Sequence, residues 1–352
     1  MKRSMTDLRM PFRSLCLAAL SLAALSIGCA VAPVGSTTSA EPGATAEARP
    51  AVSPGVVLNG PKSKAKTSSS VPISAPSAVP ASAAAQVDRG AYPWLADQTC
   101  SSQDVAGTLS ARFSPPQGFA RAPVEAGSFG AWLRGLPLRP PGPVLDHRGR
   151  VILDEGDSRF AAVAALDEGK ADLQQCADSI MRLHAEWQWS KGSRAISYRA
   201  ASGTPMPYSR WMAGERPSAS GMSLVWKPSS RPVDREDHGA FRKYLDAVFT
   251  WANTGALARD ASKVALSELR PGDFFVLAGA PGHAVLVLDV AVSKAGERAV
   301  LLGQGYMPAQ SFHVLRPSPR AVWFAIDASS EGVQTPFWPA PFPWSSLRRL
   351  DP

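Results

Sequence analysis

Two long segments of the chain carry apolar residues at the spacing of an amphipathic helix. Residues 172–189 predict the clearest helix, and Asp172 followed three residues later by Gln175 fits a capping box at its start. The apolar face of this helix would comprise Leu173, Ala177, Ile180, His184 and Trp187. A second helix is expected after Asp234, which can cap it, and a shorter one after Ser128.

A different pattern dominates the C-terminal part, where short apolar runs are separated by Pro, Gly or charged turns. Helices first and consecutive strands later predict an α+β fold with a largely antiparallel sheet. Earlier in the chain, strands are expected over 160–166, 195–200 and 222–227. The strands expected near the C-terminus cover 273–278, 283–290, 298–303, 311–315 and 321–326.

The N-terminal region has the pattern of an export signal. Residues 2–13 are basic, and the fifteen residues 14–28 carry no charge. Gly28 precedes Cys29, which resembles the bacterial lipoprotein signal and implies that Cys29 is lipidated. Ordinary signal cleavage, for example after Ala30, is the alternative. Both routes export the protein, and the first anchors it to a membrane at the periplasm or cell surface.

Composition divides the chain into three parts. We expect residues 1–28 to be a signal peptide, residues 29–90 a disordered Ala/Pro/Ser-rich tether, and residues 91–352 a single α+β domain. The tether has no aromatic residue, so it cannot bury enough apolar surface to offset its conformational entropy. Beyond the N-terminal segment, no stretch reaches the ~18 apolar residues that a membrane span needs.

Charge and cysteine content exclude several function classes. The net charge of +8 is divided equally, because residues 1–88 hold 8 basic and 4 acidic residues and residues 89–352 hold 29 and 25. A domain at +4 without a dense Lys/Arg stripe does not predict nucleic-acid binding. The four cysteines lack C-x-x-C spacing, which argues against structural zinc. No Gly-rich phosphate loop is present, which argues against a nucleotide site. We expect no metal and no cofactor.

Cys176 is the first candidate for chemistry. A cysteine in the first turn of a helix lies at the positive end of the helix dipole, which favours the nucleophilic thiolate. The adjacent Gln175 carries an amide that can donate to an oxyanion. The alternative is that Cys176 is a small buried hydrophobe and that Gln175 only completes the capping box. Export also permits a Cys100–Cys176 disulfide, which we do not expect because a nucleophile has to stay reduced.

Two further candidates lie among the expected strands. His283 follows a Gly-rich turn and opens an apolar strand, which would present its imidazole to a rim or cleft. Gln304 ends another apolar strand before Gly305, and beside His283 it would orient the imidazole as the third member of a triad does. The alternatives are that His283 only forms a hydrogen bond with its preceding turn and that Gln304 is a loop amide whose hydrogen bonds are satisfied. For Gln310 and His313 we favour this second interpretation, a loop position with satisfied hydrogen bonds.

These segments resemble the motifs of an uncharacterised bacterial family of exported, lipoprotein-type proteins, a domain of unknown function. The resemblance covers about 94–350. Its three most specific motifs are DLQQCADSI at 172–180, GAPGHAVLVLD at 279–289 and QGYMPAQSFHVL at 304–315.

A more distant resemblance concerns mechanism. A helix-borne cysteine, a Pro-Gly-Asp turn, a Gly-His pair before an apolar strand and a polar residue on the next strand follow in the order of papain-like amidases. The NlpC-type and CHAP-type cell-wall peptidases share that order. The resemblance implies a papain-like fold, with Cys176 as nucleophile, His283 as general base and Gln304 as orienting residue. The Asp-Cys-Ser-Gly signature that usually surrounds the nucleophile is absent.

Two functions from different classes therefore stand at this point. One is an exported, lipid-anchored thiol amidohydrolase or peptidase that acts on amide bonds of the cell envelope, such as those of peptidoglycan peptides. The other is a non-catalytic envelope lipoprotein that binds glycan or a partner protein through aromatic residues such as Trp211 and Trp226.

Overall fold

The computed structural model describes residues 87–96, 105–221 and 223–352. The expected signal peptide, the lipidation candidate Cys29 and Cys100 lie outside these residues, as does nearly all of the expected tether. Two short helices, η1 (Arg89–Ala91) and η2 (Pro93–Leu95), begin the described part. The Asp88 carboxylate caps η1 by accepting the Gly90 N–H at 3.0 Å. Residues 88–90 therefore belong to the folded part and not to the tether.

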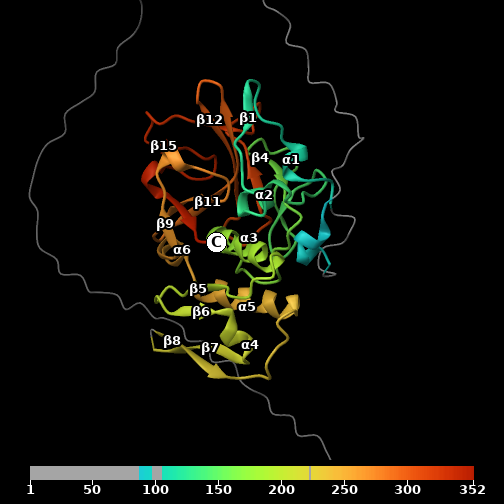
Figure 1. The fold of residues 1–352 in the computed structure, drawn as a ribbon, viewed down its shortest axis with the longest axis vertical. Helices are drawn as coiled ribbons and strands as arrows, with labels where there is room; N and C mark the ends of the chain where they lie inside the picture. Colours follow the sequence, from blue (N-terminus) through green and yellow to red (C-terminus); the bar gives the residue numbers. More distant parts are fainter. Residues whose placement is uncertain (1–86, 97–104, 222) are drawn as a thin grey trace, which may run out of the picture. The chain divides into compact units, whose positions relative to one another are not determined.

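A nine-stranded sheet is the centre of the fold (Figure 1). Its main path runs β4-β13-β12-β11-β10-β17-β9, while β1 pairs with β11 and β14 with β12. Every one of these pairs is antiparallel, which confirms the α+β prediction with a largely antiparallel sheet. The strands are β1 (Phe119–Arg121), β4 (Phe160–Val163), β9 (Ala261–Lys263), β10 (Phe274–Leu277), β11 (His283–Ser293), β12 (Arg298–Gln304), β13 (His313–Leu315), β14 (Phe324–Ile326) and β17 (Leu347–Leu350).

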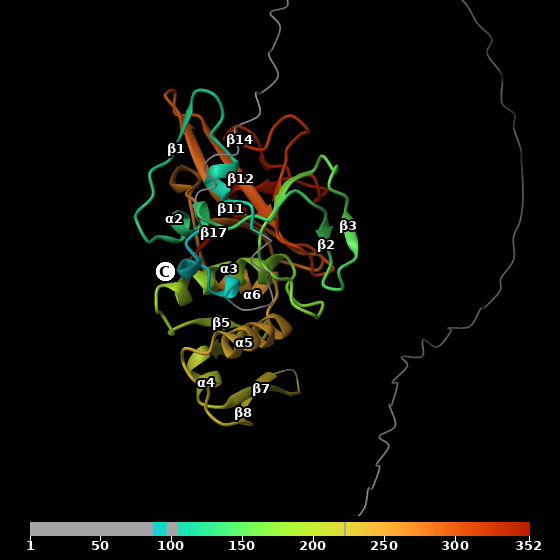
Figure 2. The ribbon, with the colours of Figure 1, turned by 90° about the vertical axis from the view of Figure 1, so that its right-hand side faces the viewer.

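Helix α3 lies between this sheet and helix α5 in both ribbon views (Figures 1 and 2). Trp189 of α3 stacks on Phe241 of α5 with ring centroids 4.4 Å apart, which joins the two helices. The helices are α1 (Leu109–Arg112), α2 (Phe129–Arg134), α3 (Cys176–Ser190), α4 (Tyr208–Met212), α5 (His238–Trp251), α6 (Thr254–Asp260), η4 (Leu266–Glu268) and η5 (Trp344–Ser346).

Four two-stranded pairs stand apart from the central sheet. Their strands are β2 (Val144–Leu145) with β3 (Val151–Leu153), β5 (Ser197–Arg199) with β6 (Pro205–Pro207), β7 (Glu215–Ser220) with β8 (Ser223–Pro228), and β15 (Gly332–Val333) with β16 (Phe342–Pro343). The β7–β8 hairpin lies with α4 beyond α5, at the bottom of both views (Figures 1 and 2).

The two faces of the sheet have different cores, because side chains alternate along each strand. Leu286 and Leu288 of β11 join the large core that contains Ile180 of α3. Val285 of β11 joins a second core with Phe342. The face of the sheet toward α3 and the opposite face are therefore both covered by a hydrophobic core. This explains why β11 is apolar at nearly every position.

The beginnings of the helices show where local signals are sufficient. Ser128 caps α2 as predicted, since its hydroxyl accepts the Ala131 N–H at 3.2 Å. The second helix, α5, begins at His238 and is capped by Asp237, not by Asp234. The carboxylate of Asp234 instead accepts the N–H of Glu236 in the preceding turn. Two acids three residues apart offer the same capping chemistry, and the chain uses the second one.

The expected start of α3 at Asp172 is also wrong. The helix begins at Cys176 with Gln175 as its N-cap, and the Asp178 carboxylate accepts the Gln175 N–H at 3.1 Å. Asp172 is engaged elsewhere, because its carboxylate accepts the backbone N–H of Ala309 at 2.7 Å. A contact with a residue far along the chain thus overrides the local capping pattern and makes Cys176 the first helical residue.

Candidate functional site

The N-terminus of α3 lies against the end of strand β12. Gly305, directly after β12, makes this close approach possible, because a Cβ there would collide with the Ser179 hydroxyl. The same Cβ would lie 3.0 Å from the carbonyl oxygen of Gln175, a contact that has to push the two segments apart. A glycine at this position therefore determines how near Cys176 comes to the ends of β11 and β12.

The thiol of Cys176 lies next to the first residues of β11. It is a free thiol and accepts a hydrogen bond from the backbone N–H of Ala284, the residue after His283. Its own N–H and that of Ala177 also favour the thiolate, as expected at a helix N-terminus. The structure therefore brings Cys176 and the start of β11 together across more than one hundred residues of sequence.

The expected low pKa of this thiol is not found. Burial raises the pKa of the Cys176 thiol to about 11, and the nearby Asp178 carboxyl adds to the increase. Desolvation thus outweighs the three N–H groups that favour the thiolate. Burial also raises the pKa of Asp178 itself to about 8. At neutral pH the resting site therefore holds a thiol and not a thiolate.

His283 and Gln304 are in direct contact. Nε2 of His283, at the start of β11, lies 2.8 Å from Oε1 of Gln304, at the end of β12. A carbonyl oxygen only accepts, so Nε2 carries the hydrogen and the lone pair of the neutral ring is on Nδ1. Burial lowers the pKa of His283 to about 4, which keeps the ring neutral at physiological pH. His283 therefore offers one basic nitrogen, Nδ1, while Gln304 fixes the other.

Aromatic side chains cover the imidazole of His283. Trp338 stacks on the ring at a centroid distance of 5.1 Å, and Tyr306 meets it edge-on at 4.8 Å. Phe342 lies at 5.8 Å. As a result, only 1% of His283 is exposed. No local sequence pattern links Trp338 or Tyr306 to His283, so neither residue could be assigned this role from the sequence.

The remaining polar candidates divide between the site and the scaffold. Gln175 uses one amide hydrogen on the Asp172 carboxylate, at 3.0 Å, and retains a second one. His313, expected to be a satisfied loop residue, instead lies in β13 opposite Gln304, with its Nε2 at 3.3 Å from the amide nitrogen. Gln310 is buried away from this contact chain and pairs with Asp146 in an isolated bridge.

The Pro-Gly-Asp turn serves the scaffold. Asp273 is fully buried, and Arg349 of β17 donates to both of its carboxylate oxygens, at 2.6 and 2.9 Å. The backbone N–H of Arg270 completes the shell at 2.9 Å. This carboxylate therefore attaches the C-terminal strand to the turn before β10 and is not available for catalysis.

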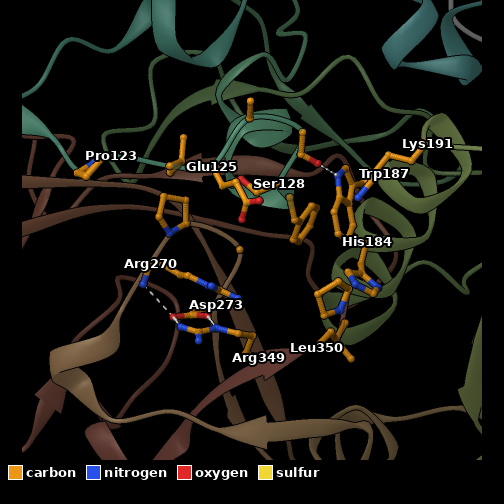
Figure 3. Close-up of a pocket in the computed structure, with 18 residues that line it drawn as sticks. Pro123, Glu125, Ser128, His184, Trp187, Lys191, Arg270, Asp273, Arg349 and Leu350 are labelled. Atoms are coloured by element: carbon orange, nitrogen blue, oxygen red, sulfur yellow. Dashed lines mark hydrogen bonds and ion pairs between the residues drawn. The ribbon is translucent and has the colours of Figure 1, made fainter.

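The same turn lines a cavity of about 470 Å³ toward the C-terminal half of α3 (Figure 3). His184 and Trp187 of α3 form one wall, and residues 123–130, 349, 350 and 352 form others. Cys176, His283 and Gln304 are not among its lining residues. Nδ1 of His184 is hydrogen-bonded to the Tyr198 hydroxyl at 3.0 Å. The cavity is thus separate from the Cys176 site.

The tryptophans proposed for glycan binding differ in exposure. Trp211 is buried, with Tyr244 at 6.1 Å and the Arg216 guanidinium 3.7 Å above its ring. Trp226 on β8 is half-buried and donates to the Pro205 carbonyl at 3.4 Å. Trp211 is therefore a core residue, and Trp226 is the more exposed of the two.

Within 87–96, 105–221 and 223–352, no three His, Cys, Asp or Glu side chains gather in a way that would hold a metal ion. In those same ranges, none of the helices combines the length and apolar character needed to cross a membrane.

A model of the family described as domain of unknown function (4846) matches residues 109–349. Because this match covers more than half of the chain, the protein belongs to that family. Neither a curated protein nor a solved structure matches the chain. The match includes the first turn of α3 and strands β10 to β14, so the Cys176, His283 and Gln304 positions lie within the family region.

Proposed function

We propose that this member of the 4846 family is an exported thiol amidohydrolase with a papain-like arrangement of Cys176, His283 and Gln304. One observation carries the proposal. The Cys176 thiol at the start of α3 accepts the N–H of Ala284, directly beside His283, whose Nε2 is held by Gln304 at 2.8 Å. A nucleophile, a base and an orienting group are the parts that acyl transfer through a thioester requires.

The reaction begins with the thiol protonated, because burial holds the pKa of Cys176 near 11. As Sγ attacks the carbonyl carbon of the substrate, its proton moves to Nδ1 of His283. The S–C bond forms and the carbonyl oxygen takes the negative charge. The free amide hydrogen of Gln175 is a candidate donor to that oxyanion.

His283 then returns the proton to the amide nitrogen, so the C–N bond breaks and the amine leaves. The acyl group remains on Cys176 as a thioester. Water, deprotonated by His283, attacks the thioester, and the sulfur regains its proton. The sum is one amide and one water converted to an acid and an amine, with no redox change and no metal step.

The substrate class follows from the N-terminal sequence. An export signal and a lipidation candidate at Cys29 would bring the domain to the cell envelope, anchored at the periplasmic or outer surface. Amide bonds accessible there include those of peptidoglycan peptides. We therefore propose envelope peptides as substrates and the membrane, through the lipid, as the anchoring partner.

Two measurements test this function. Purified protein is incubated with muropeptides, and amine release is followed by mass spectrometry. In parallel, a peptidyl epoxysuccinate, an electrophile for nucleophilic cysteines, is used to label the protein, and adduct formation at Cys176 is timed by intact mass. Wild type should cleave and be labelled, whereas Cys176→Ser should do neither and His283→Ala should lose at least ~10²-fold in rate.

Cys100→Ser is the control variant, because it removes Cys100 as an alternative site of labelling. Absence of labelling at Cys176 in the wild type, together with unchanged muropeptides, would reject the enzyme. The second function class would then be tested by muropeptide binding to Trp226→Ala, since Trp226 is the partly exposed tryptophan of the pair.

A further inference from the structure

The ring of His313 has a defined tautomer. Nδ1 of His313 lies 2.9 Å from the backbone carbonyl oxygen of Ser311, and a carbonyl cannot donate, so Nδ1 carries the hydrogen. Burial lowers the pKa of His313 to about 4, and the ring is neutral at physiological pH. Phe160 and Phe337 contact the fully buried ring edge-on. Its Nε2 therefore carries no hydrogen and can only accept a hydrogen bond, in an otherwise apolar environment.

That acceptor determines the direction of the Gln304 amide. The register of β12 and β13 pairs Gln304 with His313, and the amide nitrogen lies 3.3 Å from Nε2 of His313. Only the NH₂ end of the amide can donate to that nitrogen, so the carbonyl end is directed to His283. At His283, Oε1 therefore accepts from Nε2 across a distance of 2.8 Å.

We propose that His313 is a positioning residue that sets the tautomer of His283 through the Gln304 amide. With the opposite amide direction, Gln304 would donate to Nε2 of His283 and the ring hydrogen would move to Nδ1. An Nδ1 that carries a hydrogen cannot accept the proton of the Cys176 thiol. The catalytic role of the hydrogen bonds from His313 through Gln304 to His283 rests on the proposed function, whereas the tautomer of His283 does not.

Nitrogen chemical shifts of ¹⁵N-histidine report the tautomer directly, in the full chain and without substrate. In wild type at pH 7, we expect the hydrogen on Nε2 for His283 and on Nδ1 for His313. His313→Leu removes the acceptor for Gln304, and the His283 signals should shift to a mixture of both tautomers. His313→Gln restores an acceptor oxygen, and the wild-type His283 pattern should return.

Labelling of Cys176 by the peptidyl epoxysuccinate supplies the functional readout. We expect His313→Leu to lower the labelling rate roughly tenfold or more, since a misprotonated base forfeits part of the ~10²–10⁴-fold contribution of general base catalysis. His313→Gln should stay within about threefold of wild type. Phe160→Leu is the matched control, because it loosens the packing around His313 while leaving the hydrogen-bond chain intact.

An unchanged His283 tautomer in His313→Leu would overturn the inference, as would the same loss in His313→Gln or in Phe160→Leu. A tautomer shift in a protein whose wild type never labels at Cys176 would uphold the positioning role and reject the enzyme. If His313→Leu does not fold, Gln304→Leu replaces it. His283 then loses the group that holds its Nε2 hydrogen and should show both tautomers, and an unchanged His283 spectrum would overturn the inference.

Discussion

Nε2 of His283 and Oε1 of Gln304 are 2.8 Å apart, so the first residue of β11 and the last residue of β12 are joined by a buried hydrogen bond. Neither residue belongs to the ladder that pairs the two strands, since that ladder covers Leu286↔Gly303 to Val292↔Arg298. The bond therefore lies just beyond the paired segment, where the strand ends meet the N-terminus of α3. The proposed reaction requires the His283 imidazole to reach the Cys176 thiol from this position.

Removal of the Gln304 side chain should separate orientation from the base itself. In Gln304→Ala, His283 keeps its ring but loses the acceptor on Nε2. We expect epoxysuccinate labelling of Cys176 to slow by about 10- to 10²-fold. The free energy of unfolding in urea should fall by roughly 1–3 kcal/mol, because a buried N–H is left without a partner.

Gln310→Ala makes the same chemical change at a buried glutamine outside the chain of contacts, and its labelling rate should match wild type. Equal labelling rates in Gln304→Ala and Gln310→Ala would contradict an orienting role for Gln304.

The Asp178 carboxyl makes stability depend on pH with a defined sign. Its pKa is raised by burial to about 8 from an ordinary value of 3.8. In the folded state the carboxyl therefore stays protonated up to about pH 8. Its contribution to stability is complete below pH 4 and is lost as pH rises from about 4 to 8. Asp178→Asn cannot ionise, and its oxygen can still accept the Gln175 N–H.

The free energy of unfolding of Asp178→Asn, measured in urea at pH 5, 7 and 9, should therefore gain on wild type as pH rises. A constant difference between the two proteins across this range would show that Asp178 does not titrate in the folded state.

Gly305→Ala tests the close approach of α3. The added methyl group would collide with the Ser179 hydroxyl and press on the Gln175 carbonyl. We expect a loss of about 1–3 kcal/mol in the free energy of unfolding, as in other overpacked sites, and a lower labelling rate because Cys176 moves away from His283.

Ser179→Ala in the same chain removes the hydroxyl and should recover part of both losses. No recovery in the double variant would mean that the contact with the Gln175 backbone, and not the hydroxyl, dominates the effect of Gly305→Ala.

Asp289 should be among the most sensitive scaffold residues. Its fully buried carboxylate pairs with Arg121 and with Arg134, the latter at 2.9 Å. Asp289→Ala leaves two partly buried guanidinium groups without a counter-charge and should cost about 3–5 kcal/mol in thermal or urea unfolding.

Glu236→Ala is the comparison, because Glu236 is 62% exposed in its pairs with Arg194 and Arg235 and should change stability by no more than ~1 kcal/mol. Similar losses in the two variants would contradict the importance assigned to burial of Asp289.

The sequence by itself determined the elements whose signals are local. Ser128 was sufficient to place α2, and the strands expected at 283–290 and 298–303 correspond to β11 and β12 within a few residues. Apolar patterning and turn residues act over a few positions, so such elements can be found without knowledge of the rest of the chain. The choice of Cys176, His283 and Gln304 as candidates came from the same kind of signal.

Tertiary structure alone decided the chemistry of these candidates. Asp172 does not cap α3 because it binds the backbone of Ala309, and the Cys176 pKa is raised because distant segments desolvate the half-buried thiol. The hydrogen bonds that link His283, Gln304 and His313 form because β11, β12 and β13 are neighbours in the antiparallel sheet. Burial and long-range hydrogen bonds depend on residues far apart in sequence, and no local pattern encodes them.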